Sequence, residues 1–307
     1  MNIILFCLPL FGKAIIQKLI DQGTPPAFIV GPARAHPTFD EMLKIAHSFN
    51  LPVLIFEQNP TEERFVKRIN ELSPDLIIVA SYPHYIPEAV FSAAKIAAVN
   101  AHPSLLPHYR GANPYFHVVK NGEQQTGVTL HLLDEGFDTG NIISQQKFKL
   151  NATETTGSLE KRTTPVVVSV VTDFVKQVQA SGLPKTQTQP TGSYLKAPRV
   201  KLPLPLIDWN LSAKQIDQLI RAANPHYAIN TLLNNELIVI VSGRPVESTS
   251  NNKIAGKIEA IDEQGMRVST ANGAYLVTSL LCPYYWHGDP LGALKLGLIQ
   301  QGECFRL

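Results

Sequence analysis

The chain is poor in cysteine and has no paired cysteine motif. Only three cysteines occur among 307 residues, and they are widely separated at Cys7, Cys282 and Cys304. This number and spacing exclude a disulfide framework and a tetrahedral cysteine metal site, and they fit a reducing compartment. We therefore expect three small core residues in a cytoplasmic protein.

Long apolar runs and an excess of charge of one sign are also missing. No apolar stretch approaches the roughly 20 residues that span a bilayer, so no membrane association is expected. The run 3–11 lacks the basic leader and small-residue cleavage site of a signal peptide, and we interpret it as a first strand. The formal net charge of +2 gives no general argument for binding nucleic acid.

The turn after this first strand lacks the glycines of a dinucleotide-binding fingerprint. It reads Leu8-Pro9-Leu10-Phe11-Gly12, with one glycine where three are needed to approach a pyrophosphate. This argues against a nicotinamide cofactor.

The first half of the chain alternates apolar strands with helices. Strands are predicted at 2–8, 27–30, 53–56, 76–80, 96–99, 127–133 and 141–150, and helices after Gly12, at 38–49, at 62–72, from Asn113-Pro114 and at 155–178. Such alternation predicts an α/β fold with a Rossmann-like, mostly parallel sheet. The alternating pattern of the last strand indicates an antiparallel edge.

The second half of the chain has a different composition. Residues 181–203 are rich in proline, threonine, glutamine and lysine and show little periodicity. Beyond them, a capping box at Ser212 and Gln215 starts one helix, and several short strands follow. We therefore expect a catalytic domain at 1–182, a linker at 183–203 and a smaller antiparallel β-barrel domain, OB-like, at 204–307.

Residues capable of chemistry gather at the ends of two predicted strands. Asn100 and His102 follow the strand 96–99, in a proline-bounded loop that extends to Gly111, and Asp138 lies in a turn after the strand 127–133. Ligands of open α/β sheets bind at the carboxyl ends of strands, so an amide, an imidazole and a carboxylate there are placed to act on a substrate.

This combination resembles the formyltransferase family that uses 10-formyltetrahydrofolate. The resemblance rests on Asn100, His102, Ser104, Leu-Leu-Pro at 105–107, Arg110-Gly111 and Asp138-Thr139-Gly140, and it covers the whole chain, more strongly at 75–145 than elsewhere. The family includes methionyl-tRNA formyltransferase, sugar N-formyltransferases, hydroxyornithine formyltransferases and glycinamide ribonucleotide transformylase. The resemblance implies a one-carbon transferase with 10-formyltetrahydrofolate as co-substrate and no metal.

The same resemblance assigns roles to individual residues. It implies catalytic residues Asn100, His102 and Asp138; residues for the folate co-substrate at Tyr82, Ile86, Pro87, Leu105, Asp134 and Gly136; and residues for the acceptor substrate at Ser104, Arg110 and Gly111. The amide NH₂ of Asn100 could donate to the oxyanion, His102 could donate a second bond or relay a proton, and Asp138 could orient the imidazole.

The acceptor amine is the open question. The segment 31–40, where methionyl-tRNA formyltransferases carry a basic insertion, holds only Arg34 and His36, and residues 204–307 hold eight Lys plus Arg against nine Asp plus Glu, a net of 8 − 9 = −1. We therefore favour a small-molecule amine, such as an amino sugar nucleotide or an amino-acid-derived amine. Methionyl-tRNA as acceptor, and hydrolysis of the formyl group by water, stay as alternatives. The oligomeric state is open.

Overall fold

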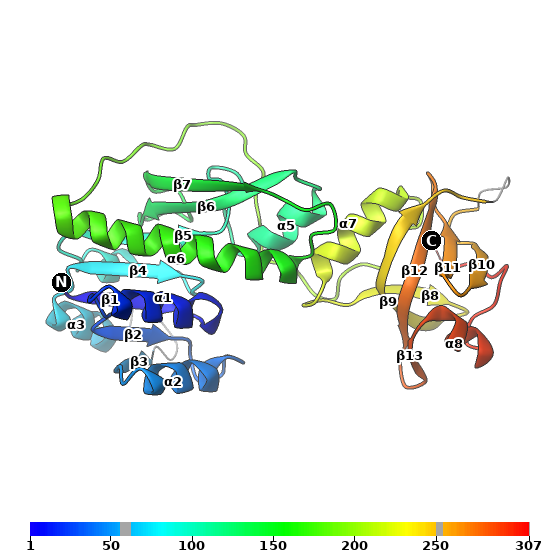
Figure 1. The fold of residues 1–307 in the computed structure, drawn as a ribbon, viewed down its shortest axis with the longest axis horizontal. Coiled ribbons are helices and arrows are strands. Elements are labelled where there is room, and N and C mark those ends of the chain that lie inside the picture. The colour runs from blue at the N-terminus through cyan, green and yellow to red at the C-terminus, as the bar shows by residue number, and fades with distance from the viewer. Residues whose placement is uncertain (56–62, 250–253, 307) are drawn as a thin grey trace. The chain divides into compact units, whose positions relative to one another are not determined.

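The computed structural model of the chain describes residues 1–55, 63–249 and 254–306 and consists of two compact units (Figure 1). Unit 1 comprises Met1–Pro114, Gln125–Leu150 and Glu160–Pro198, and unit 2 comprises Tyr115–Gln124, Asn151–Leu159 and Arg199–Leu307. Each unit is built around its own β-sheet.

The sheet of unit 1 has seven strands in the order β3-β2-β1-β4-β5-β6-β7. They are β1 (Ile3–Cys7), β2 (Phe28–Gly31), β3 (Val53–Ile55), β4 (Leu76–Ala80), β5 (Ala97–His102), β6 (Gln125–Leu132) and β7 (Ile142–Lys149). The first five pair in parallel, whereas β6 is antiparallel to both β5 and β7. The predicted mostly parallel, Rossmann-like sheet and its antiparallel edge are confirmed.

Helices cover both faces of this sheet. They are α1 (Pro9–Asp21), α2 (Phe39–Ser48), α3 (Glu63–Leu72), α4 (Glu88–Phe91) and α6 (Thr156–Ser181), which belongs to unit 1 from Glu160 onward, while α5 (Pro114–Lys120) belongs to unit 2 from Tyr115 onward. Side chains of β1 alternate: Ile4 and Phe6 pack in one core cluster with Phe65 and Ile69 of α3, while Cys7 lies against α1 on the other face. Because both faces are covered, β1 and β4 are fully apolar and buried.

Helix α1 begins three residues before Gly12, where the sequence predicts it to open. Pro9 occupies the first helical turn after an extended Leu8, a position in which the missing proline N–H costs no hydrogen bond. Gly12 is instead a packing residue, because a Cβ atom there would lie 2.8 Å from Cys7 Sγ.

Strand β5 continues further than its apolar pattern indicates. The sequence predicts a strand that ends at Val99, yet Asn100 and His102 both pair with β6 and therefore belong to the strand itself. The polar side chains break the hydrophobic pattern but leave the backbone ladder intact, so pattern alone ended the strand too early.

Unit 2 contains a six-stranded antiparallel sheet. Its strands are β8 (Ile229–Leu233), β9 (Glu236–Val246), β10 (Ile258–Asp262), β11 (Gly265–Ser269), β12 (Ala274–Cys282) and β13 (Trp286–Gly288), ordered β10-β11-β12-β9-β8 with β13 beside β12. The last described residues join its two edges: Arg306 N–H donates to Leu232 O, and Ile258 N–H donates to Glu303 O. The edge strands are thereby covered, as in a closed barrel.

Two helices accompany this sheet, α7 (Ala213–Ala223) and α8 (Pro290–Lys295). The predicted capping box is present, since Ser212 Oγ accepts from Gln215 N–H and the Gln215 side chain accepts from Ser212 N–H. The short elements α8 and β13 are not predicted from the sequence. Trp209 and Phe305 are fully buried and stack with ring centroids 5.3 Å apart in this unit.

Some predictions concern single residues. Cys7 and Cys282 are buried as expected, but Cys304 is exposed, so its prediction as a core residue was wrong. Phe56, the last residue of a predicted strand, and Glu62, the first of a predicted helix, lie outside the described residues.

Among the helices in the described ranges, none combines the length and apolar character that a membrane crossing requires.

Gly140 gives a stability test of the turn that follows β6. A Cβ atom at this position would overlap the carbonyl oxygen of Leu132, a backbone atom that cannot rotate away. We expect Gly140→Ala to destabilise the protein by about 1–3 kcal/mol, as overpacking does, and to lower the midpoint of thermal unfolding by several degrees.

The matched control is Gly31→Ala. A Cβ atom there meets its nearest neighbour, Met42 Cγ, at an ordinary 3.4 Å. Equal unfolding temperatures for the two variants would contradict the close packing of the turn against β6.

Candidate active site

Asn100 and His102 lie two residues apart on β5, so their side chains project from the same face of the sheet. Antiparallel pairing places His131 of β6 directly opposite Asn100. Asn100 Nδ2 lies 3.2 Å from His131 Nε2 and 3.2 Å from Asp138 Oδ1. The structure thus brings the three predicted catalytic residues together with one more. We refer to Asn100, His102, His131 and Asp138 as the Asp138 cluster.

The Asp138 carboxylate is the centre of this cluster. Its Oδ1 accepts from Asn100 Nδ2, and its Oδ2 accepts from Gly111 N–H at 2.9 Å. His102 Nδ1 and His131 Nε2 each lie 3.5 Å from Oδ1. The side chain is only 13% exposed. Nitrogen atoms from four residues therefore surround a largely buried negative charge, which needs such compensation.

These neighbours hold the pKa of Asp138 well below its usual range. Burial by itself would raise this pKa, but the neighbouring His102 and His131 imidazoles and the Gly111 N–H outweigh it. Asp138 is therefore a carboxylate throughout the range in which enzymes work.

His102 is buried and has one of its two nitrogens committed. Nε2 lies 2.8 Å from the carbonyl oxygen of Tyr109, which can only accept, so Nε2 carries a hydrogen. Nδ1 is left facing Asp138. Burial lowers the pKa of His102 below 6.5, against the opposing effects of Asp138 and the Tyr109 carbonyl. At neutral pH the imidazole is thus mainly neutral, with Nδ1 ready to take a proton beside a carboxylate.

His131 escapes prediction from the sequence. Its Nδ1 lies 2.7 Å from Leu132 O and therefore donates, and its Nε2 is placed to accept from the Asn100 amide at 3.2 Å. A signal does exist: His131 is the one histidine in the predicted strand 127–133 and lies seven residues before Asp138. Only the register of β5 and β6 turns that signal into a contact.

The amide of Asn100 is more constrained than the sequence indicates. Both of its hydrogens already have acceptors, one on Asp138 and one on His131. To donate to an oxyanion, as predicted, the amide must exchange one of these acceptors. The bond to Asp138 is the stronger of the two, because its acceptor is ionised.

The residues predicted for the acceptor substrate are placed around the loop 103–111. Ser104 is fully buried, and its Oγ donates to His108 O at 2.8 Å, so it fixes the loop. Arg110 donates through Nε and Nη2 to Gln189 Oε1. The backbone of Gly111 supplies a hydrogen bond to Asp138. In this structure all three support the loop and the carboxylate.

The residues predicted for the folate co-substrate fall into two groups. Asp134 accepts from Gly136 N–H at 3.1 Å and from the Thr139 hydroxyl, so it orders the turn that carries Asp138. Tyr82 and Ile86 pack into the core cluster on one face of the sheet, Pro87 precedes the first turn of α4, and Leu105 is half-buried beside Gly127. By these contacts the four side chains hold the loops 81–87 and 103–111 in place.

An exposed aromatic pair, Tyr85 and Phe137, connects the loop 81–87 with the turn 134–138. The rings of Tyr85 and Phe137 lie 5.1 Å apart, and the Tyr85 hydroxyl donates to Glu135 O at 2.9 Å. Phe137 is 68% exposed although it directly precedes Asp138. An exposed apolar surface, made of two rings tilted by 54° to each other, therefore lies next in sequence to the carboxylate.

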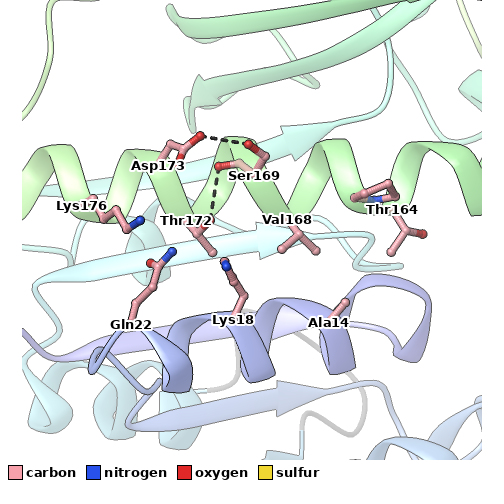
Figure 2. Close-up of a pocket in the computed structure, with 10 residues that line it drawn as sticks. Ala14, Lys18, Gln22, Thr164, Val168, Ser169, Thr172, Asp173 and Lys176 are labelled. Atoms are coloured by element: carbon pink, nitrogen blue, oxygen red, sulfur yellow. Dashed lines mark hydrogen bonds between the residues drawn. The ribbon is translucent and has the colours of Figure 1, made fainter.

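A separate pocket of about 520 Å³ lies between α1 and α6. Figure 2 shows Lys18 and Gln22 of its lining on the side opposite Thr172 and Lys176. No residue of the Asp138 cluster lines it. Within residues 1–55, 63–249 and 254–306, no group of three or more histidine, cysteine and carboxylate side chains is arranged to hold a metal ion. The candidate active site is therefore the Asp138 cluster.

Comparisons with known proteins identify the family of the chain. Residues 2–174 match the formyl transferase family, and residues 204–282 match the formyl transferase C-terminal domain. The methionyl-tRNA formyltransferase of Syntrophus aciditrophicus is 31% identical over 86% of this chain and 86% of its own, and that of Clostridioides difficile is 27% identical over 92% and 93%.

A solved structure shares the fold. The N-formyltransferase from Helicobacter canadensis, in complex with folinic acid and dTDP-3-aminofucose, superposes with a TM-score of 0.65 at 18% identity, covering 90% of this chain and 98% of that one. Fold and site thus define a group-transfer enzyme of the α/β class. The chain belongs to the formyltransferase family, and its activity is formyl transfer.

Asp138→Asn tests the electrostatics of the cluster. Asparagine keeps the shape of the side chain but removes the charge that raises the pKa of His102, so that pKa should fall further below 6.5. Titration of the His102 imidazole by NMR measures it. We expect kcat to fall by roughly 10²–10⁴ with the loss of acid–base assistance.

The matched control is Asp173→Asn. Asp173 is exposed on α6 and accepts from Ser169 within the same helix, so this variant should leave both the His102 titration and kcat unchanged. An Asp138→Asn protein in which the pKa of His102 stays where it is or rises would contradict the proposed coupling.

Proposed function

We propose that this formyltransferase moves a formyl group from 10-formyltetrahydrofolate to a primary amine of a small molecule. The observation that carries the transfer is the Asp138 cluster at the end of β5, which unites an amide, two imidazoles and an ionised carboxylate. Folate as donor is supported by the complexes of similar solved structures, with folinic acid in one and tetrahydrofolic acid in the HypX protein of Aquifex aeolicus.

The residues present fit such a co-substrate. The exposed aromatic pair Tyr85 and Phe137, next in sequence to Asp138, offers ring faces on which a planar heterocycle can pack. Tyr82 and Ile86 pack in the core and hold the loop 81–87 in place, so that its backbone can meet the polar edge of a heterocycle. When bound, the co-substrate supplies an amide-like formyl carbon that a neutral amine can attack.

The cluster can carry the charges and protons of this transfer. Attack forms a bond from the amine nitrogen to the formyl carbon and shifts an electron pair to the formyl oxygen. Asn100 can donate to that oxygen, a role worth about 3–4 kcal/mol in other enzymes. His102 Nδ1 can take the amine proton, because Asp138 stabilises the resulting imidazolium. When the bond to the leaving nitrogen breaks, the same imidazole can return the proton to it.

The scarcity of positive charge in two segments of the chain favours a small acceptor. The connection between β2 and α2 is short, residues 32–38, and its only lysine or arginine is Arg34. Residues 204–307 carry a net charge of 8 − 9 = −1. Binding to the phosphates of a tRNA requires several positive charges in register along the backbone. Neither segment provides them.

Methionyl-tRNA is the second candidate acceptor. Relatives of that name align with about nine-tenths of this chain, including the antiparallel unit. The segment 183–203, with four basic and no acidic residues, is the positively charged stretch that a tRNA could contact.

The acceptor is tested by measuring consumption of formyltetrahydrofolate against a panel of amines that includes amino sugar nucleotides, amino-acid-derived amines and charged methionyl-tRNA. We expect the highest kcat/KM with a small amine, with a KM that changes about twofold or less between 50 and 200 mM salt. A tRNA substrate held by 6–10 phosphate contacts would lose roughly 10³–10⁵ in affinity over that range.

A kcat/KM for methionyl-tRNA equal to or above that of every small amine would overturn the proposed acceptor. Release of formate at the full rate without any amine would instead assign the chain as a hydrolase.

A further inference from the structure

The segment after α6 crosses the candidate active site. Residues 187–197, which we call the strap, pair with Ile142 through Gln187 and with Arg110 through Lys196. Gln187 and Ile142 exchange both backbone hydrogen bonds at 2.7 and 2.8 Å, and Ala197 N–H donates to Arg110 O at 2.8 Å. The strap is therefore anchored to the β7 side of the site at one end and to the loop 103–111 at the other. A region predicted as a linker is in this part an ordered component of unit 1.

One side chain of the strap reaches the catalytic loops. Gln189 is 6% exposed. Its Nε2 donates to Asp138 O at 2.9 Å and to Gly140 O at 2.8 Å, while its Oε1 accepts from Arg110 Nε at 3.1 Å and from Nη2. Both hydrogens and both lone pairs of the amide are thus used, which is the full capacity of a glutamine side chain.

The two carbonyl oxygens bound by Gln189 flank the turn from Asp138 to Gly140. Asp138 has a φ of 57°, in the left-handed region that residues other than glycine adopt at a cost. Such a conformation persists where the surroundings over-determine it. Gln189 supplies two of these constraints from outside the turn, and Gly111 supplies a third through its bond to the carboxylate.

The acceptor side of the same amide fixes the opposite loop. Arg110 immediately precedes Gly111, whose N–H bonds Asp138 Oδ2. By holding the Arg110 guanidinium, Gln189 restrains the backbone that presents this N–H. A single buried amide therefore ties the loop that carries the carboxylate to the loop that bonds it.

We propose that Gln189 is a positioning residue for formyl transfer, which keeps the Asp138 carboxylate in register with His102 and Asn100 by clamping the turn 138–140 to Arg110. This inference rests on the proposed function for its kinetic part. It assigns a task to a residue of the strap, about fifty positions away from the carboxylate that it orients.

The test compares Gln189→Met and Gln189→Glu with the wild-type enzyme. Methionine has a similar length and no charge, and it removes all four hydrogen bonds. Glutamate retains an acceptor for Arg110 but cannot donate to the two carbonyl oxygens. Because misplacement of a catalytic group by about 1 Å can cost 10²-fold in rate, we expect both variants to lose roughly ten- to a hundredfold in kcat, with KM within a few fold of wild type.

The matched control is Tyr194→Phe. It removes a hydroxyl from the same strap, one that bonds only Thr191 O in the described contacts, and keeps the ring against His108. Its kcat should equal that of the wild type. Urea unfolding of each variant establishes the folded fraction, so that kcat is expressed per folded enzyme.

A second readout does not depend on turnover. The groups that face the His102 imidazole are the Asp138 carboxylate, the Tyr109 carbonyl and His131. If the clamp holds Asp138 beside His102, the pKa of His102, followed by NMR, should fall in Gln189→Met, in the same direction as in Asp138→Asn. A side chain that only stabilises the fold would leave the titration midpoint of the folded protein in place.

The outcomes are distinct. A Gln189→Glu enzyme with wild-type kcat, or a Gln189→Met protein with an unchanged His102 titration, would overturn the clamp. If the wild-type protein transfers no formyl group, the proposed function fails. The clamp still stands in that case if the titration midpoint of His102 is lower in Gln189→Met than in the wild type.

Discussion

The structure of the active site depends on one buried negative charge. A carboxylate that is 13% exposed requires compensation, and Asp138 accepts hydrogen bonds from the Asn100 amide and the Gly111 N–H and lies 3.5 Å from two imidazole nitrogens. These groups come from two strands and one loop. The carboxylate therefore organises β5, β6 and the loop 103–111 around itself, and the low pKa of Asp138 follows from that arrangement.

The change from parallel to antiparallel pairing between β5 and β6 brings these groups together. Parallel strands β1 to β4 deliver their carboxyl ends to one edge of the sheet, whereas β6 returns antiparallel to β5 and brings His131 opposite Asn100. The turn after β6 then leads back to the same cluster with Asp138. Side chains separated by 31 and 38 positions along the chain become neighbours because one strand pair is antiparallel.

The sequence predicts what depends on local pattern and composition. The alternation of strands and helices, the antiparallel edge, the capping box at Ser212 and the trio of Asn100, His102 and Asp138 are all readable, the trio through its resemblance to a family. His131 and Gln189 are not, because their roles depend on strand register and on the return path of the strap. Likewise, β5 extends to His102, but the polar side chains of Asn100 and His102 break the apolar pattern from which the end of the strand was predicted.

The residues that would carry out the chemistry differ from the residues that would select the acceptor. In the proposed transfer, the Asp138 cluster acts on atoms that every primary amine has in common, a nitrogen lone pair and a proton to be lost, so nothing in the cluster needs to differ between a sugar amine and an aminoacyl-tRNA. Discrimination must come from residues that meet the rest of the acceptor. A short β2–α2 connection and a nearly neutral stretch at 204–307 are features of that second kind, which is why they bear on the acceptor although they lie outside the cluster. A change of acceptor can therefore proceed by change of loops and surface charge while the buried carboxylate and its donors stay the same.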